Sequence, residues 1–241
     1  VAGRVLLRTE DGVETRLGHL DRDLLVIPSL AIHMQRQVNK GHEYNPQIDM
    51  QPLWGPEAGR TLTDLVCEEL GVRPEEILDQ DLQLVTRQAP TVIGPDGEYF
   101  MAPRIDDLEC AATTLLGFID AAADTDSACA PVWAMLDNEE VGSSSRQGAE
   151  SSFLRDVLDR ILEAIPHSAQ MEHRALANSF MLSADNGHAT HPNFAAKSDP
   201  AAPVRLGGGV VLKYNASQKY TTNALSGGIF RAICEKAGVK V

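Results

Sequence analysis

The spacing of apolar residues changes at about residue 100, and this change limits the folds open to the chain. Before it, short apolar runs separated by turn residues predict strands on both sides of the Asp11-Gly12 turn and again over residues 82–88 and 98–101. After it, helical and strand-like stretches alternate, which is typical of an α/β protein with a parallel or mixed sheet and flanking helices. The sequence therefore predicts a β-rich domain over residues 1–100 and an α/β domain over residues 101–241.

One helix is predicted in the first hundred residues and three in the rest of the chain. Residues 61–70 place four apolar side chains on one face and precede Gly71, a residue typical of helix ends. Apolar residues recur at helical spacing over residues 108–119, 153–165 and 222–236. Strand-like runs at residues 131–136, 179–183 and 210–214 lie between these helices and predict the strands of the α/β sheet.

Charge and cysteine content exclude several classes of protein. A net charge of −13 and an isoelectric point near 4.9 argue against a nucleic-acid or anionic-membrane partner. The four cysteines show no paired spacing, so neither a disulfide framework nor a thiolate zinc site is indicated, and a reducing, cytoplasmic setting is expected. We find no apolar run of the 18 to 20 residues that a membrane helix needs, and no signal-peptide pattern at the N-terminus.

Three short acidic segments follow predicted strands or precede predicted helices, at residues 102–107, 136–143 and 183–188. In α/β proteins such positions gather at one edge of the sheet. Carboxylates suit Zn²⁺ or Mn²⁺, and one shared between two ions creates a pair that activates water. The adjacent Glu139 and Glu140 offer one ligand and one proton acceptor.

Each segment also has an ordinary structural explanation. Acidic pairs such as Glu139 and Glu140 are usually solvated surface, and an Asp before a helix, such as Asp106, is usually an N-cap. Taken alone, each segment is more often a cap or a turn than a site. Their occurrence together after apolar strands favours a metal site.

Several longer strings carry a family resemblance. They are residues 27–33 (IPSLAIH), 102–106 (APRID), 137–143 (DNEEVGS), 183–185 (SAD), His188 with 191–193 (HPN), 215–218 (NASQ), Tyr220 and 223–224 (NA). In this order, and over the whole chain, they resemble the aspartyl aminopeptidase family of zinc peptidases. The resemblance implies an aminopeptidase with two zinc ions per subunit, Mn²⁺ or Co²⁺ being alternatives, that removes N-terminal acidic residues from peptides.

The resemblance also implies roles for single residues. Asp106 is expected to bridge the two metals, Glu140 and Asp185 to bind one metal each, and Glu139 to act as general base. Two histidines of the family's site come from segments before Val1 and after Val241, so the chain is expected to be a central fragment. The family has Asn or a small polar residue where this chain has Asp107.

Four further residues are expected at the substrate pocket. The resemblance places His188, Lys213 and Tyr220 around the substrate, with the Lys213 ammonium facing its acidic side chain. His33 is expected to reach a neighbouring active site across a subunit interface, in a homo-oligomer, a dodecamer built from dimers, whose contacts residues 1–100 provide. Without the family, His33 and Tyr220 are ordinary packed residues and Lys213 a solvent-facing strand residue.

Two other functions stay open on the sequence alone. The same two-metal fold suits an N-acyl amino-acid deacylase or a peptidase of broad specificity, and Lys213 distinguishes these from an acidic-specific aminopeptidase. A self-assembly module with a vestigial site is the third alternative, because two metal-binding histidines are absent from the 241 residues.

Overall fold

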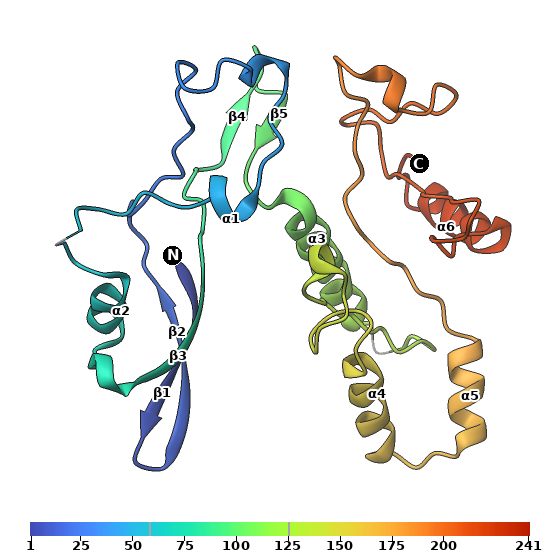
Figure 1. The fold of residues 1–241 in the computed structure, drawn as a ribbon. Coiled ribbons are helices and arrows are strands. Elements are labelled where there is room, and N and C mark those ends of the chain that lie inside the picture. Colours follow the sequence, from blue (N-terminus) through green and yellow to red (C-terminus); the bar gives the residue numbers. More distant parts are fainter. Residues whose placement is uncertain (58, 125) are drawn as a thin grey trace. The chain divides into compact units, whose positions relative to one another are not determined.

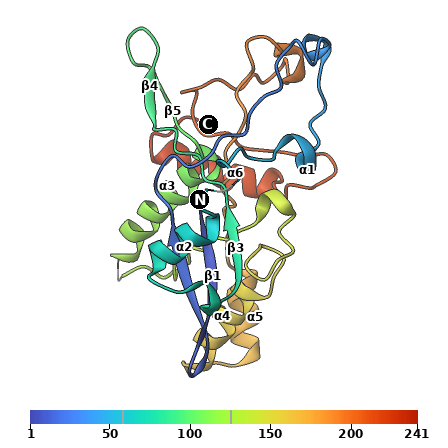
Figure 2. The same cartoon turned by 60° about the vertical axis from the view of Figure 1, so that its left-hand side comes forward.

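The computed structural model describes every residue of the chain except 58 and 125, and it divides the chain into two compact units, Val1–Pro103 and Arg104–Val241. Figures 1 and 2 show the helices and strands of both units. Among the described residues, no helix combines the length and apolar character required to cross a membrane.

A three-stranded antiparallel sheet forms the first unit's framework. It is built from β1 (Ala2–Thr9), β2 (Gly12–His19) and β3 (Ile77–Gln83) in the order β2-β1-β3. The β1–β2 hairpin pairs Thr9 with Gly12, so its turn has two residues, Glu10 and Asp11, one residue before the predicted Asp11-Gly12 turn. A second antiparallel pair, β4 (Thr91–Ile93) with β5 (Tyr99–Met101), follows along the chain.

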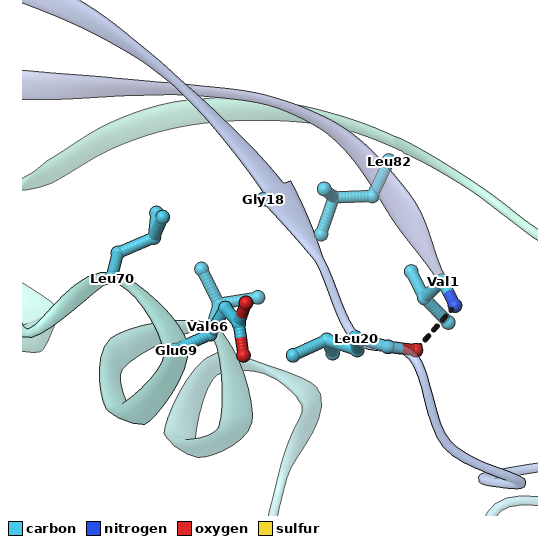
Figure 3. Close-up of a pocket in the computed structure, with 7 residues that line it drawn as sticks. All are labelled: Val1, Gly18, Leu20, Val66, Glu69, Leu70 and Leu82. Atoms are coloured by element: carbon cyan, nitrogen blue, oxygen red, sulfur yellow. Dashed lines mark hydrogen bonds between the residues drawn. The ribbon is translucent and has the colours of Figure 1, made fainter.

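Helix α2 (Leu62–Leu70) covers this sheet and closes the core. Its apolar face brings the buried Leu65 and Val66 against Val5 and Leu7 of β1. A small apolar hollow remains beside them, between α2 and the start of β1, and in Figure 3 the Val1 ammonium bonds the Leu20 carbonyl across its rim. The core is therefore local to the sheet and α2. Short helices η1 (Val38–Lys40), α1 (Pro46–Asp49) and η2 (Pro74–Glu76) lie outside it.

The second unit consists of helices joined by long extended segments. Its helices are α3 (Ile105–Ala122), η3 (Glu139–Val141), α4 (Phe153–Glu163), α5 (Ala169–Ala177), η4 (Ala195–Lys197) and α6 (Ala224–Lys236). Helices α4 and α5 lie side by side in Figures 1 and 2, and an ion pair between Arg155 and Glu172 joins them. The predicted helices at 108–119, 153–165 and 222–236 are all present, whereas α5 was not predicted.

The predicted parallel or mixed sheet is not formed among the residues that the structure describes. Every strand there is antiparallel, and residues 131–136, 179–183 and 210–214 are extended but form no ladder. They make only scattered backbone bonds, such as Val210 N–H to the Lys240 carbonyl at 2.9 Å. An apolar run becomes a strand only when neighbouring strands satisfy its backbone groups. What the structure supports is a mixed α/β protein with small sheets and flanking helices.

Candidate metal centre

Asp106 and Asp107 stand at the start of α3 but outside its regular turns. Their backbone angles are non-helical, at φ −81°, ψ 112° and φ −118°, ψ 28°, so the regular helix begins at Leu108. The peptide bond between the two aspartates is cis. The residue directly before the regular turns is Asp107, so Asp106 does not have the N-cap role that its place in the sequence suggests.

The carboxylate of Asp185 meets these two from a distant part of the chain. Oxygen atoms of Asp106, Asp107 and Asp185 all lie within 4.8 Å of one another, and the three side chains are exposed. Three negative charges at this separation repel one another, and a bound cation relieves the repulsion. Carboxylate oxygens are suitable ligands for zinc and manganese. The donor set therefore fits a divalent metal ion, with access from solvent.

Lys213 supplies the positive charge next to this cluster. Its ammonium donates to an Asp185 carboxylate oxygen at 2.6 Å and to the Asn186 main-chain carbonyl at 3.1 Å, and it lies 5.9 Å from the ring centre of Tyr220. Partial burial acts to lower the pKa of Lys213, but the hydrogen bond and charge of Asp185, with smaller effects from Tyr220 and Asp106, outweigh it. The net result is a pKa above the ordinary value, so the ammonium stays charged at neutral pH.

Glu139 and Glu140 occupy the 3-10 helix η3, and both are exposed. The residues on either side of η3, Asn138 at φ 62° and Gly142 at φ 99°, are in the left-handed conformation, so the chain reverses sharply at both ends. Neither glutamate belongs to the cluster of three aspartates, which is the one such group of potential ligands within the described chain. Their predicted roles as general base and ligand stay predictions.

The loop over residues 137–150 that carries these glutamates is tightly closed. The Asn138 amide donates to the Ser145 hydroxyl at 2.6 Å, and the Ser143 N–H donates to the Asn138 carbonyl at 2.9 Å. Gly148 is buried, and a Cβ built on it would lie 2.0 Å from the Ser143 carbonyl oxygen. Only glycine fits there, and the loop conformation depends on it.

The remaining predicted pocket residues are less constrained. His188 is exposed, three residues after Asp185, and Tyr220 is 44% exposed with Lys213 near its ring. His33 belongs to the first unit, where it is exposed in a turn closed by the bond from Met34 N–H to the Ala31 carbonyl. The structure thus brings together Asp106, Asp185, Lys213 and Tyr220 of the predicted residues.

Three residues that the sequence did not single out connect the segment that carries Asp185 to α3. The Asn186 side chain donates to Glu109 at 3.0 Å and accepts from the Cys110 thiol at 3.5 Å. Burial raises the pKa of Cys110 to about 12, together with a side-chain hydrogen bond to Asp107 and the charges of Asp107, Glu109 and Asp185, so the thiol stays protonated at neutral pH. The sequence contained one signal, because Asn186 directly follows a predicted ligand.

Comparison with known proteins identifies the family. The family described as "Aminopeptidase I zinc metalloprotease (M18)" matches residues 1–241. A "Probable M18 family aminopeptidase 2" of Clostridium acetobutylicum is 39% identical over 99% of this chain and 56% of its own length. The chain therefore spans little more than half the length of this relative.

Solved structures show the same likeness. The chain matches one described as "Cryo-EM structure of the Ape4 and Nbr1 complex" with a TM-score of 0.90 and 32% identity, covering 99% of this chain and 50% of the other. It matches the S. cerevisiae mApe1 dodecamer with a TM-score of 0.78 and 25% identity, over 100% of this chain and 56% of the other. These matches confirm the family expected from the residue strings. The chain belongs to the M18 family of zinc metalloproteases.

Proposed function

We propose that the protein containing this chain is a zinc aminopeptidase that removes the N-terminal residue of peptides. The observation that carries the proposal is the convergence of Asp106, Asp107 and Asp185 within 4.8 Å, in a chain of the M18 family. Two of these three residues are the ligands that the residue strings predict. The third, Asp107, adds a carboxylate where the family resemblance implies an uncharged side chain.

In this proposal Asp106, Glu140 and Asp185 hold two zinc ions, with Mn²⁺ or Co²⁺ as alternatives. Such ions polarise the scissile carbonyl and lower the pKa of a water molecule. Glu139 accepts a proton from the attacking water on a carboxylate oxygen and passes it to the nitrogen of the leaving amine. Glu139 is exposed in η3, which is compatible with contact to a substrate and supports this role.

We propose that the substrate's first residue is acidic. Lys213 carries the supporting evidence, since its ammonium lies at the edge of the aspartate cluster and has a raised pKa. An ammonium is a suitable partner for the carboxylate of an N-terminal Asp or Glu. His188 and Tyr220 complete the substrate pocket in this proposal.

We propose a homo-oligomer, a dodecamer built from dimers, in which residues 1–100 form subunit contacts and His33 enters a neighbour's active site. The related mApe1 is described as a dodecamer, and His33 is exposed in its turn. A reducing compartment such as the cytoplasm is proposed too. It fits four free cysteines, of which Cys129 is exposed.

The test compares two neighbouring glutamates in the complete gene product. Glu139→Gln should keep the metal content and lower kcat about 10²- to 10⁴-fold, because it removes a general base and no ligand. Glu140→Gln is the matched control and should lose metal as well as activity. Metal content is measured by mass spectrometry of the purified proteins, and activity with aminoacyl p-nitroanilides.

The same measurements separate the rival functions. Wild-type protein that hydrolyses N-acyl amino acids and not aminoacyl substrates would establish a deacylase. A folded wild type with neither metal nor activity after zinc, manganese or cobalt addition would establish a self-assembly module. Full activity in Glu139→Gln would show that another group takes the proton.

A further inference from the structure

We propose that the side chain of Asn186 is a positioning residue, which holds Asp185 at the correct distance from Asp106 for both to bind metal. This inference rests on the proposed metal-dependent function. It concerns a residue that lies next to a predicted ligand and has no role in the residue strings that carry the family resemblance.

Asn186 uses each of its side-chain polar groups on α3. The amide nitrogen donates to the Glu109 carboxylate at 3.0 Å, and the amide oxygen accepts from the Cys110 thiol at 3.5 Å. The two partners are adjacent residues in the first regular turn of the helix. A donor and an acceptor on neighbouring residues fix the plane of the amide, which a single bond would leave free to rotate.

These bonds connect Asp185 to the part of the chain that carries Asp106. Glu109 follows Asp106 by three residues, and Asn186 follows Asp185 by one. The two ligand-bearing segments are far apart in sequence, so direct contacts must set the separation of their carboxylates. The Lys213 ammonium adds a further contact, by donating to the Asn186 main-chain carbonyl at 3.1 Å.

Metal affinity is sensitive to such contacts. Carboxylate oxygens bind zinc at about 2.0–2.2 Å, so a small shift of one ligand lengthens its bond to the metal. Loss of a group that orients a ligand typically weakens metal binding about 10- to 100-fold. We expect a loss of this size when the Asn186 side chain is removed.

The experiment measures metal binding directly in the complete protein. Asn186→Ala is titrated with Zn²⁺ by calorimetry and with Co²⁺ by visible absorption, whose bands report ligand geometry. The expected result is an affinity about 10- to 100-fold below wild type, with altered cobalt bands and an unchanged thermal midpoint of the metal-free protein.

Conservative substitutions of the two residues that bond to Asn186 provide matched controls. Cys110→Ser keeps a donor for the Asn186 oxygen and should bind metal within about threefold of wild type, whereas Cys110→Ala should weaken binding. Glu109→Gln keeps an acceptor without the charge and separates the hydrogen bond from electrostatics. The double variant Asn186→Ala, Glu109→Ala should bind metal no more weakly than the double variant Asn186→Ala, Glu109→Gln, because both already lack the bond between residues 186 and 109.

The outcomes distinguish this inference from the proposed function. A wild type that binds metal and an Asn186→Ala variant with the same affinity and the same cobalt bands would overturn the positioning role alone. A wild type that binds no metal would overturn the proposed function and the inference built on it. If Asn186→Ala fails to fold, the metal affinities of Cys110→Ala and Cys110→Ser are compared instead. Equal affinities in that pair would count against the positioning role.

Discussion

Lys213 is the residue at which metal binding and substrate choice meet. Its ammonium donates to Asp185, a predicted metal ligand, and in our proposal it also receives the substrate's acidic side chain. Because its folded pKa lies above the ordinary value of 10.5, the charge is present below that pH and is lost only on rising through the higher folded pKa. Preference for acidic substrates should therefore not weaken between neutral pH and about pH 9.5, as kcat/KM profiles for Asp and Leu substrates would show.

Removing this charge should change selectivity more than overall catalysis. We expect Lys213→Gln to lower kcat/KM for Asp-p-nitroanilide about 10- to 100-fold, the value of one charge-assisted hydrogen bond, and to affect Leu-p-nitroanilide much less. Lys213→Arg keeps the charge and is the control. An unchanged Asp-to-Leu ratio in Lys213→Gln would contradict the acidic pocket.

For single residues, the sequence predicted two of the three clustered aspartates but not the hydrogen bonds around them. Asp106 and Asp185 were predicted, and the structure places them together. The contribution of Asp107 depends on non-helical backbone angles that no residue spacing reveals. Asn186 acts through two partners that are 76 and 77 residues away, a separation that a single sequence does not connect.

Among the elements, α2 shows how local chemistry defines a helix at both ends. The Thr61 hydroxyl accepts from the Asp64 N–H at 3.1 Å while the Asp64 carboxylate accepts from the Thr61 N–H at 2.7 Å. Gly71 ends the helix in the left-handed conformation at φ 65°. The sequence predicted this helix correctly because its apolar face and both ends are set by neighbouring residues.

Loss of this cap should measurably lower the stability of the protein. We expect Thr61→Ala to lower the free energy of unfolding by about 1 kcal/mol, since it leaves the Asp64 N–H without its partner. Urea unfolding followed by circular dichroism measures the change. Thr61→Ser retains the hydroxyl and should stay close to wild type, and equal loss in both variants would show that the methyl group matters instead.

Strands were predicted less well than helices for a physical reason. The helical runs stabilise themselves through bonds four residues apart, whereas residues 131–136 and 210–214 need a partner strand at a distance. Their apolar composition shows a preference for burial but does not specify the partner. The β1–β2 hairpin was predictable because its two-residue turn makes the partner local.

For the whole molecule, the decisive question is whether one subunit completes another's active site. His33 lies in the first unit and Glu139 in the second, and in the proposed oligomer they act in the same site from different subunits. Co-expression of His33→Ala with Glu139→Gln subunits should then restore activity, in roughly a quarter of the sites of randomly mixed dimers.

Single variants and separately purified mixtures that do not exchange subunits serve as controls. Each should remain near its own low rate, and size-exclusion chromatography with light scattering should show the same assembly for all. Co-expressed protein no more active than the better single variant would indicate that His33 acts within its own subunit or not at all.

Gly148 is a position at which no other amino acid fits without moving the backbone. Its missing side chain leaves room for the Ser143 carbonyl, so the loop with Glu139 and Glu140 depends on a residue with no chemistry of its own. Every amino-acid replacement open to a glycine codon by a single base change adds a Cβ. Every replacement of this amino acid therefore brings a Cβ against the Ser143 carbonyl, and the loop keeps its shape only while the residue stays glycine.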